Sequence, residues 1–311
     1  MTVDALRDAM PDWRFPDGTL ARAGARVHLE PQQAGWTFSG LQVIDLGATA
    51  EHVADLQGVE AVIVPLSARD VVVEVDGVVY PLAGRHGVFA AVSDWLYAPV
   101  GSRVRITGKS GEVAICTVLA DRAYPVVYTP ADAVPVEVRG SGRATRQVTN
   151  IATPGSFTGA QRINVCEVLT PGGNWSSWPP HRHDGIDDCP YTNEEIYYFR
   201  LGDGSTPHGH RDAQGLFRVY TVDGTVDRTW TILDGDVVVV PHGYHGPSVA
   251  APEYPMYFLN VLAGPDPERT MGFCDDPAHH WIRQTWPDQQ IDPRCPMTDA
   301  TGRVNPGEVT R

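Results

Sequence analysis

Three stretches of this 311-residue chain decide its fold: Trp178-Pro-Pro-His-Arg-His-Asp184, Glu194-Glu-Ile-Tyr-Tyr198 and Asp234-Gly-Asp-Val-Val-Val-Val-Pro-His-Gly-Tyr-His245. Residues i and i+2 of a strand face the same way, so His181 and His183 should project side by side. Glu195 opens a run of β-branched and aromatic residues that predicts a strand. His245 follows a turn and a short apolar strand. We therefore expect three imidazoles and one carboxylate to converge from neighbouring strands.

Three neutral imidazoles and a carboxylate are a ligand set for one divalent cation, so we interpret these four residues as a metal site. The alternative, four unrelated polar residues, is disfavoured because every member has a strand or strand-edge context. Zinc is the cation we expect, although manganese, iron, nickel and cobalt accept the same donors. A zinc site with four protein ligands is normally closed, so catalysis here requires further coordination positions for substrate oxygens.

The other histidines and the cysteines have a weaker case as ligands. His208 and His210 stand among Gly, Pro, Arg and Asp, so we assign them to a loop near the mouth of the site. His279-His280 lies beyond the expected barrel strands, and His242 is expected to face solvent. The 5 cysteines are scattered and never spaced as Cys-x-x-Cys, which predicts reduced cytosolic thiols. Cys189 lies near the His pair, but we interpret it as incidental.

Composition narrows the class of protein further. A formal net charge of −14 at pH 7 disfavours nucleic acid and anionic membranes as partners. No stretch is apolar enough to span a membrane, and the amino terminus lacks the features of a signal peptide, so we expect a cytoplasmic protein. Plentiful Gly and Pro, short β-type runs and a hairpin signal at Asp76-Gly77 favour an all-β fold.

Two parts of the chain share this β texture, from about residue 35 to 120 and from about 160 to 265. Two patterns recur in the same order: Glu60-Ala-Val-Ile-Val-Pro-Leu66 resembles Glu195-Ile-Tyr-Tyr-Phe-Arg-Leu201, and Pro99-Val-Gly-Ser-Arg103 resembles Pro241-His-Gly-Tyr-His245. The first part has no His pair, and Arg103 stands where His245 would be. We therefore predict an internal repeat whose first copy keeps the barrel but has no metal site.

These signals predict four segments. They are a barrel without metal at 1–139, a linker or long loop at 140–160, a metal-binding barrel at 161–283 and a tail at 284–311. The linker prediction rests on a mostly polar run from Gly140 to Asn150. The tail is rich in Pro, Asp and Arg and offers little core material, so we expect it to wrap the surface or to be partly disordered.

His-x-His, then Glu, then Gly-x5-Pro-x-Gly with a following His resembles the paired motifs of the cupin superfamily. One departure is that His245 follows Gly243 by two residues, where the usual spacing is three. Longer stretches resemble the 5-deoxy-glucuronate isomerase family of myo-inositol catabolism, namely 174–184, 194–198, 217–221, 234–245, 257–264 and 276–282. The resemblance implies a bicupin, with two antiparallel double-stranded β-helix (jelly-roll) barrels. It also implies one metal in the second barrel, bound by His181, His183, Glu195 and His245.

The resemblance further implies an aldose–ketose isomerase that converts 5-deoxy-D-glucuronate to 5-dehydro-2-deoxy-D-gluconate, so the expected partner is a uronate sugar. A cation bound to the carbonyl and the neighbouring hydroxyl oxygen would acidify the adjacent C–H. Three alternatives remain: a 4-deoxy-5-hexulose-uronate ketol-isomerase, a cupin dioxygenase and a non-catalytic sugar-binding bicupin. Exposed sheet edges favour a homo-oligomer without indicating its size.

The residues that act on the substrate are harder to assign. The base is either an acidic residue or metal-bound hydroxide, and Glu194 is a poor candidate because strand alternation turns it outward. Tyr257 is a candidate proton relay because it is polar within an apolar strand, with a wall tyrosine as the alternative. Asn260 cannot share its face. For the substrate carboxylate we favour Arg218 and then Arg146, each with a structural salt bridge as the alternative.

Overall fold

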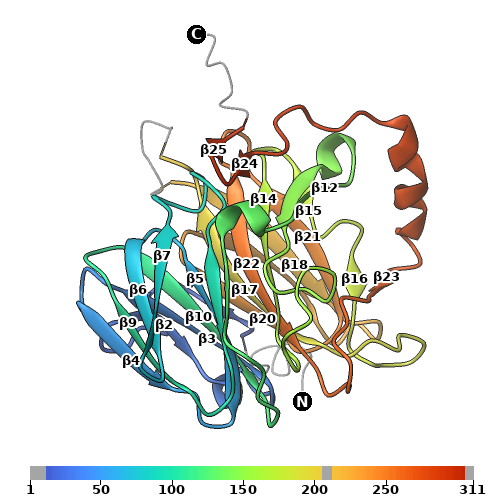
Figure 1. Ribbon diagram of the computed structural model, residues 1–311. Helices are drawn as coiled ribbons and strands as arrows, with labels where there is room; N and C mark the ends of the chain where they lie inside the picture. The colour runs from blue at the N-terminus through green and yellow to red at the C-terminus, as the bar shows by residue number, and fades with distance from the viewer. Residues whose placement is uncertain (1–11, 205–211, 305–311) are drawn as a thin grey trace.

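A computed structural model describes residues 12–204 and 212–304 (Figure 1). Strands dominate this part of the chain, which confirms the predicted all-β class. The helical segments described are short: α2 (Pro31–Ala34), η1 (Ala131–Ala133), η2 (Gly142–Ala144) and η3 (His280–Asp288). No helix among the described residues has the length and apolar character needed to cross a membrane.

The first half of the chain forms two antiparallel sheets, which we call the first barrel. The 6-stranded sheet has the order β11 (Val127–Thr129), β8 (Trp95–Ala98), β5 (Val59–Pro65), β10 (Glu112–Leu119), β3 (Ser39–Asp45) and β2 (Ala25–Leu29). The 4-stranded sheet has the order β4 (Glu51–Asp55), β9 (Arg103–Thr107), β6 (Arg69–Val75) and β7 (Val78–Gly84). Alternate residues of both sheets, such as Ile63 and Val73, bury one apolar core between them.

The predicted hairpin at Asp76-Gly77 is confirmed, because these two residues join the paired strands β6 and β7. Both have positive φ, 50° and 84°. Positive φ at two central positions is the type I′ turn, whose twist matches that of the flanking strands. The Asp76 carboxylate also accepts the backbone N–H of Arg103 at 2.8 Å, which ties the hairpin to β9.

The second half forms the second barrel, again from two antiparallel sheets (Figure 1). The 7-stranded sheet has the order β1 (Arg14–Phe15), β20 (Val237–Val240), β17 (Glu194–Leu201), β22 (Met256–Ala263), β14 (Asn164–Thr170), β13 (Arg146–Thr149) and β12 (Val136–Arg139). The 6-stranded sheet contains β19 (Asp227–Leu233), β18 (Gln214–Tyr220), β21 (Tyr244–Ala250), β16 (His181–Arg182) and β23 (Cys274–Asp275), with β15 (Trp175–Ser176) paired to β21. A large apolar cluster fills this barrel and continues into the packing between the two barrels.

Three segments lie elsewhere than the sequence predicts. The strands β1 and β12, assigned to the first barrel, belong to the 7-stranded sheet of the second, where β1 pairs with β20. Part of the predicted linker is strand β13, which pairs with β12 and β14. The cause is local: Gly140 and Gly142 adopt positive φ and turn the chain between two short alternating runs.

The C-terminal segment wraps the surface through its described residues, one of the two outcomes expected. The side-chain oxygen of Gln147 accepts the backbone N–H groups of Met297 (2.7 Å) and Thr298 (2.9 Å). Arg303 donates to the carbonyl oxygen of Phe89 in the first half at 3.1 Å. The short strands β24 (Thr298–Asp299) and β25 (Gly302–Arg303) form a hairpin in this segment.

A reciprocal pair of carboxylates joins the two barrels. Glu60 on β5 accepts the three backbone N–H groups that precede β14, at 2.8, 2.6 and 2.8 Å, from Gln161, Arg162 and Ile163. Glu194 on β17 accepts three backbone N–H groups at the start of β3, at 2.8, 2.9 and 2.9 Å, from Thr37, Phe38 and Ser39. Each barrel therefore anchors a strand of the other through equivalent contacts, as expected for an internal repeat.

This symmetry corrects the alignment of the two halves by one residue, because Glu60 corresponds to Glu194 and not to Glu195. The strand register agrees. Ala61 pairs with Ala98, and Glu195 pairs with Val240. Ala98 and Val240 each directly precede the Pro of the shared Pro-x-Gly pattern. The counterpart of Glu195 in the first barrel is therefore Ala61.

Candidate metal centre

Neighbouring strands of the second barrel position the predicted ligands. His181 on β16 lies directly opposite His245 on β21. Just beyond β16, the Nδ1 of His183 lies 2.9 Å from the carbonyl oxygen of Asn193. That carbonyl accepts the Nδ1–H, so in the neutral ring the lone pair that can bind a metal is on Nε2. Glu195, the second residue of β17, points into the barrel because Glu194 points out of it.

His183, Glu195 and His245 form a compact buried group whose ligand atoms all lie within 4.8 Å of one another. The Nε2 atoms of His183 and His245 lie 2.9 and 3.0 Å from the same Oε2 of Glu195. The contact between Nε2 of His245 and Oε2 of Glu195 is not aligned as a hydrogen bond. Both ring nitrogens of the buried His245 therefore lack a hydrogen-bond partner among the described residues. Buried polar atoms are normally satisfied, so the group fits a divalent cation as its missing partner.

The fourth predicted ligand, His181, lies beside this group. Its ring centroid is 4.5 Å from that of His245 and 6.3 Å from that of His183. Burial, followed by repulsion from the other two imidazoles, lowers the pKa of His181 well below its ordinary value. His181 is therefore neutral, which is the form that binds a metal. The structure thus brings three of the predicted ligands together and places the fourth next to them.

The charges of this group suit cation binding. Burial alone would raise the pKa of Glu195, but its contacts with His183 and His245 outweigh burial and bring the pKa well below its ordinary value. Burial lowers the pKa of His183, but Glu195 raises it more, so the net pKa of His183 lies above its ordinary value. Glu195 is therefore ionised, and a bound cation would displace the proton that His183 shares with it.

A cavity of about 250 Å³ opens beside this group. Apolar side chains such as Phe258, Leu262 and Met271 form part of its wall. Asn260 also lines it, while His181, His183 and Glu195 supply the metal side. The cavity is near the lower end of the range for small-molecule sites and mixes apolar walls with a few polar groups, as such sites do.

Tyr197 is a cavity residue that the sequence analysis missed. It lies two residues after Glu195 on β17, so it faces the same side of the strand. Its hydroxyl is 3.4 Å from the Oγ of Ser177. Burial, and then the charge of Glu195, raises the pKa of Tyr197 well above its ordinary value, so the phenol stays protonated. The alternation that placed Glu195 inside the barrel also predicts Tyr197 there.

Tyr257, the predicted proton relay, faces away from the cavity. Its hydroxyl donates to the buried Glu167 at 2.7 Å, and its ring packs edge-on against Phe89 of the first half. The buried guanidinium of Arg85 pairs with the same Glu167. Tyr257 therefore belongs to the packing between the barrels. Asn260 lies three residues after Tyr257 on β22 and so faces the opposite side of the strand, where it lines the cavity.

Arg218, our first choice for the substrate carboxylate, lies on the outer face of β18. It binds both oxygens of Asp227, at 2.9 and 3.0 Å, and its guanidinium covers the ring of Tyr220 at 4.2 Å. Its neighbours Phe217 and Val219 are fully buried, so alternation turns Arg218 outward. The structural salt bridge, our stated alternative, is what forms. Arg146, our second choice, lines the cavity.

Among the described residues, the remaining histidines do not join the compact group of His183, Glu195 and His245. His242 is only partly exposed, because its ring packs edge-on against Trp13 at 5.0 Å. His280 in η3 lies 3.0 Å from a carboxylate of β23. The loop predicted around His208 and His210 falls outside the described residues.

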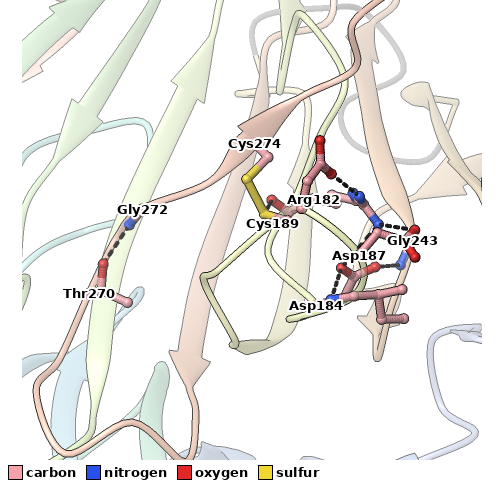
Figure 2. Close-up of a disulfide and its surroundings, with 10 residues drawn as sticks. Arg182, Asp184, Asp187, Cys189, Gly243, Thr270, Gly272 and Cys274 are labelled. Atoms are coloured by element: carbon pink, nitrogen blue, oxygen red, sulfur yellow. Dashed lines mark hydrogen bonds and ion pairs between the residues drawn. A yellow bond between two sulfur atoms is a disulfide. The ribbon is translucent and has the colours of Figure 1, made fainter.

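Cys189 and Cys274 form a disulfide, which corrects the prediction that all cysteines are reduced (Figure 2). The two are separated by 85 residues in sequence, so no local pattern links them. Pairing of β16 with β23 sets Arg182 opposite Cys274. The Cα atoms of Cys189 and Cys274 lie 5.8 Å apart, within the range for a disulfide. Cys116, Cys166 and Cys295 remain free and buried.

The disulfide and a hydrogen bond tie the segment following His183 to neighbouring strands (Figure 2). The carboxylate of Asp184 accepts the backbone N–H of Gly243 at 2.9 Å. Gly243 lies two residues before His245 and has a φ of 90°, which favours glycine. The segments that carry His183 and His245, two of the candidate ligands, are therefore connected directly.

Two antiparallel barrels, with a buried His/Glu group inside the second, define the bicupin class. Solved structures agree on this fold. The oxalate decarboxylase of Bacillus subtilis superposes with a TM-score of 0.59, covering 86% of this chain and 80% of that chain. Its 12% sequence identity supports likeness of fold alone.

Within that class, this chain belongs to the KduI/IolB family, whose model matches residues 16–282. It is 35% identical over 275 residues to the 5-deoxy-glucuronate isomerase of Geobacillus kaustophilus (strain HTA426), covering 87% of this chain and 95% of that relative. It is likewise 35% identical over 253 residues to the protein of that name from Bacillus subtilis (strain 168), covering 79% and 88%. An IolB-like protein from Salmonella typhimurium LT2 superposes with a TM-score of 0.77 at 30% identity, covering 88% and 99%. The family inferred from the sequence motifs is confirmed.

Proposed function

We propose that this protein is a metal-dependent aldose–ketose isomerase that converts 5-deoxy-D-glucuronate to 5-dehydro-2-deoxy-D-gluconate. The observation that carries the proposal is the buried group of His183, Glu195 and His245 beside a sugar-sized cavity. Relatives that share 35% of their residues over most of the chain are named 5-deoxy-glucuronate isomerases, which supports this substrate over other uronates.

The residues present would hold one divalent cation, with His183, Glu195 and His245 as ligands and His181 beside them. When bound, such a cation polarises a carbonyl and a neighbouring hydroxyl oxygen and stabilises negative charge on them. We propose zinc, although manganese, iron, nickel and cobalt accept the same donors. Elemental analysis of the purified protein identifies the metal.

The reaction moves hydrogen from C2 to C1 of the sugar and moves the carbonyl from C1 to C2. Tyr197 keeps its proton at neutral pH, so its hydroxyl is able to donate to the substrate oxygen that gains hydrogen. Ser177 lies at 3.4 Å and orients that hydroxyl. The apolar wall at Phe258 and Leu262 limits access of water to the reacting carbons.

Turnover of purified protein on 5-deoxy-D-glucuronate tests the proposal, before and after treatment with a chelator. We expect isomerisation without oxygen consumption, loss of activity with the metal, and recovery when a divalent cation is added back. Turnover of 4-deoxy-5-hexulose-uronate instead would assign the other uronate isomerase activity. Full activity in metal-free protein would refute the proposal.

Two tyrosines on adjacent strands provide a matched pair for the proton-donor role. Tyr197→Phe removes the hydroxyl in the cavity, so kcat should fall by about 100-fold, within the usual range for a general acid. Tyr257→Phe removes a hydroxyl that faces the first barrel, so kcat should stay at the wild-type value. A large loss of kcat in Tyr257→Phe alone would restore our original assignment.

A further inference from the structure

Three arginines line the cavity that contains the metal residues: Arg139 at the end of β12, Arg146 at the start of β13 and Arg283 in η3. Arg139 and Arg146 lie directly opposite each other across the hairpin. Like charges in that position destabilise a sheet. The cluster therefore carries a cost that a bound anion would relieve.

Among the described residues, two of the three have a carboxylate partner and Arg146 has none. Arg139 donates to Glu137 at 2.7 Å, and Arg283 donates to both oxygens of Asp275, at 2.5 and 2.7 Å. The described residues supply no carboxylate to Arg146, whose guanidinium donates to a backbone carbonyl oxygen at 3.1 Å. Arg146 is thus the unbalanced positive charge at the cavity wall, where it is half-buried, and a charge that is partly removed from water without a counter-ion is costly.

The surroundings of Arg146 are built to hold a guanidinium. Trp286 of η3 makes cation–π contacts with two of the arginines, with its ring centroid 5.8 Å from the guanidinium of Arg146 and 5.0 Å from that of Arg283. Gly140 has a φ of 74°, and a Cβ there would lie 2.2 Å from the carbonyl oxygen of Ala144, the acceptor of the Arg146 guanidinium, so glycine leaves that acceptor accessible. Burial, then repulsion from Arg283 and Arg139, lowers the pKa of Arg146 to about 10, which still leaves it charged at pH 7.

We propose that Arg146 binds the carboxylate of the sugar substrate, and that Arg283 and Trp286, which lie outside the barrel strands, complete this anion site. The planar fork of a guanidinium matches the two oxygens of a carboxylate. A protein of net charge −14 repels an anionic sugar unless cations gather at the site. The identity of the anion as a uronate rests on the proposed function, whereas the anion site itself rests on these contacts.

Calorimetric binding to the full-length, metal-loaded protein tests this site without turnover, with D-glucuronate as the anionic probe and D-glucose as the neutral one. In Arg146→Gln, affinity for D-glucuronate should fall by about 10- to 100-fold, as expected when a charge-assisted hydrogen bond is lost. Affinity for D-glucose and metal content should stay unchanged. Arg218→Gln is the matched control, because Arg218 faces outward, and it should behave as wild type.

Two further variants separate recognition from folding. Arg146→Lys keeps the charge but loses the fork, so it should bind D-glucuronate with intermediate affinity. Trp286→Ala should weaken D-glucuronate binding by about 3-fold, as expected for loss of a cation–π contact. If Arg146→Gln fails to fold by circular dichroism, these two variants decide, and wild-type affinity in both would overturn the proposal.

The outcomes also separate this site from the proposed reaction. A wild-type preference for D-glucuronate over D-glucose in folded Arg146→Gln would refute the anion site, even if the protein isomerises 5-deoxy-D-glucuronate. Arg146-dependent binding of D-glucuronate in a protein that fails to isomerise any deoxy-uronate would refute the reaction and leave the anion site supported.

Discussion

The two barrels share strand order and reciprocal anchors, but they differ at the positions that make the metal group. Ala61 occupies the place of Glu195, and Arg103 occupies the place of His245 in the shared Pro-x-Gly pattern. His245 is fully buried, whereas the side chain of Arg103 is 69% exposed and pairs with Asp55 on the surface. A few side chains at the strand ends therefore separate a scaffold barrel from one with a metal group.

The first barrel keeps the side chains that hold it against the second barrel. Glu60 anchors the start of β14, and the buried Arg85 reaches across to Glu167 on the same strand. Strand β14 lies next to β22 and β13 in the sheet that carries the cavity. The first barrel thus supports the sheet of the second barrel, while the candidate metal residues lie in the second barrel alone among the described residues.

The largest difference in activity should appear when His245 in the second barrel and its counterpart Arg103 in the first are each replaced by alanine. His245→Ala removes a buried candidate ligand, so metal content should be lost and turnover of 5-deoxy-D-glucuronate should fall by about 100-fold or more, since even outer partners of a metal site are worth about 10- to 100-fold. Arg103→Ala should leave both unchanged. Elemental analysis and steady-state kinetics measure the contrast, and retention of metal in His245→Ala would contradict it.

The disulfide distinguishes the second barrel among the described residues and should have the next largest effect. It closes a long loop and ties the segment after His183 to β23, so Cys189→Ser with Cys274→Ser should lower the free energy of unfolding by about 3 kcal/mol. Urea unfolding of wild type and the double variant measures this. Thiol titration of the denatured wild type should find the three free cysteines. Five titratable thiols would restore the prediction from sequence.

The reciprocal anchors should have similar effects in both barrels. Glu60→Ala and Glu194→Ala each leave three backbone N–H groups without their acceptor, so each should lower the free energy of unfolding by about 2 kcal/mol. Metal content measured on the folded variants should persist, because neither carboxylate belongs to the metal group. A much larger loss for one variant would show that the repeat does not divide support evenly.

The fold and the clustering of the candidate ligands were predictable because strand alternation and the spacing of His-x-His and Pro-x-Gly are local properties of the sequence. Arg218 and Tyr257 were assigned to the wrong face, because a polar residue in an apolar run does not reveal which side of its strand is the interior. Tyr197 was predictable from its spacing to Glu195. The disulfide was not, because it depends on pairing between β16 and β23.

The contacts of the C-terminal segment with the second barrel could not be predicted from the sequence either, because they also join residues far apart in the chain. Asp292 receives a hydrogen bond from Asn174 (3.0 Å) and three from Arg294, and its backbone N–H donates to the hydroxyl of Thr145. These residues lie near the start of β13, which carries Arg146. The pH dependence of stability tests how firmly this segment is held there.

The hydrogen bonds from Arg294, ahead of the opposing effect of partial burial, lower the pKa of Asp292 from 3.8 to about 2. A depressed pKa in the folded state stabilises the protein above the unfolded-state pKa, and this contribution disappears as the pH falls through the folded-state value. At pH 7, Asp292→Asn should therefore be less stable than wild type by about 1 kcal/mol, after allowance for solvent screening at the exposed Arg294. The difference should shrink as the pH falls from about 4 towards about 2, measured by urea unfolding across that range. A difference that does not change with pH would show that the segment is held by packing and not by the ionised carboxylate.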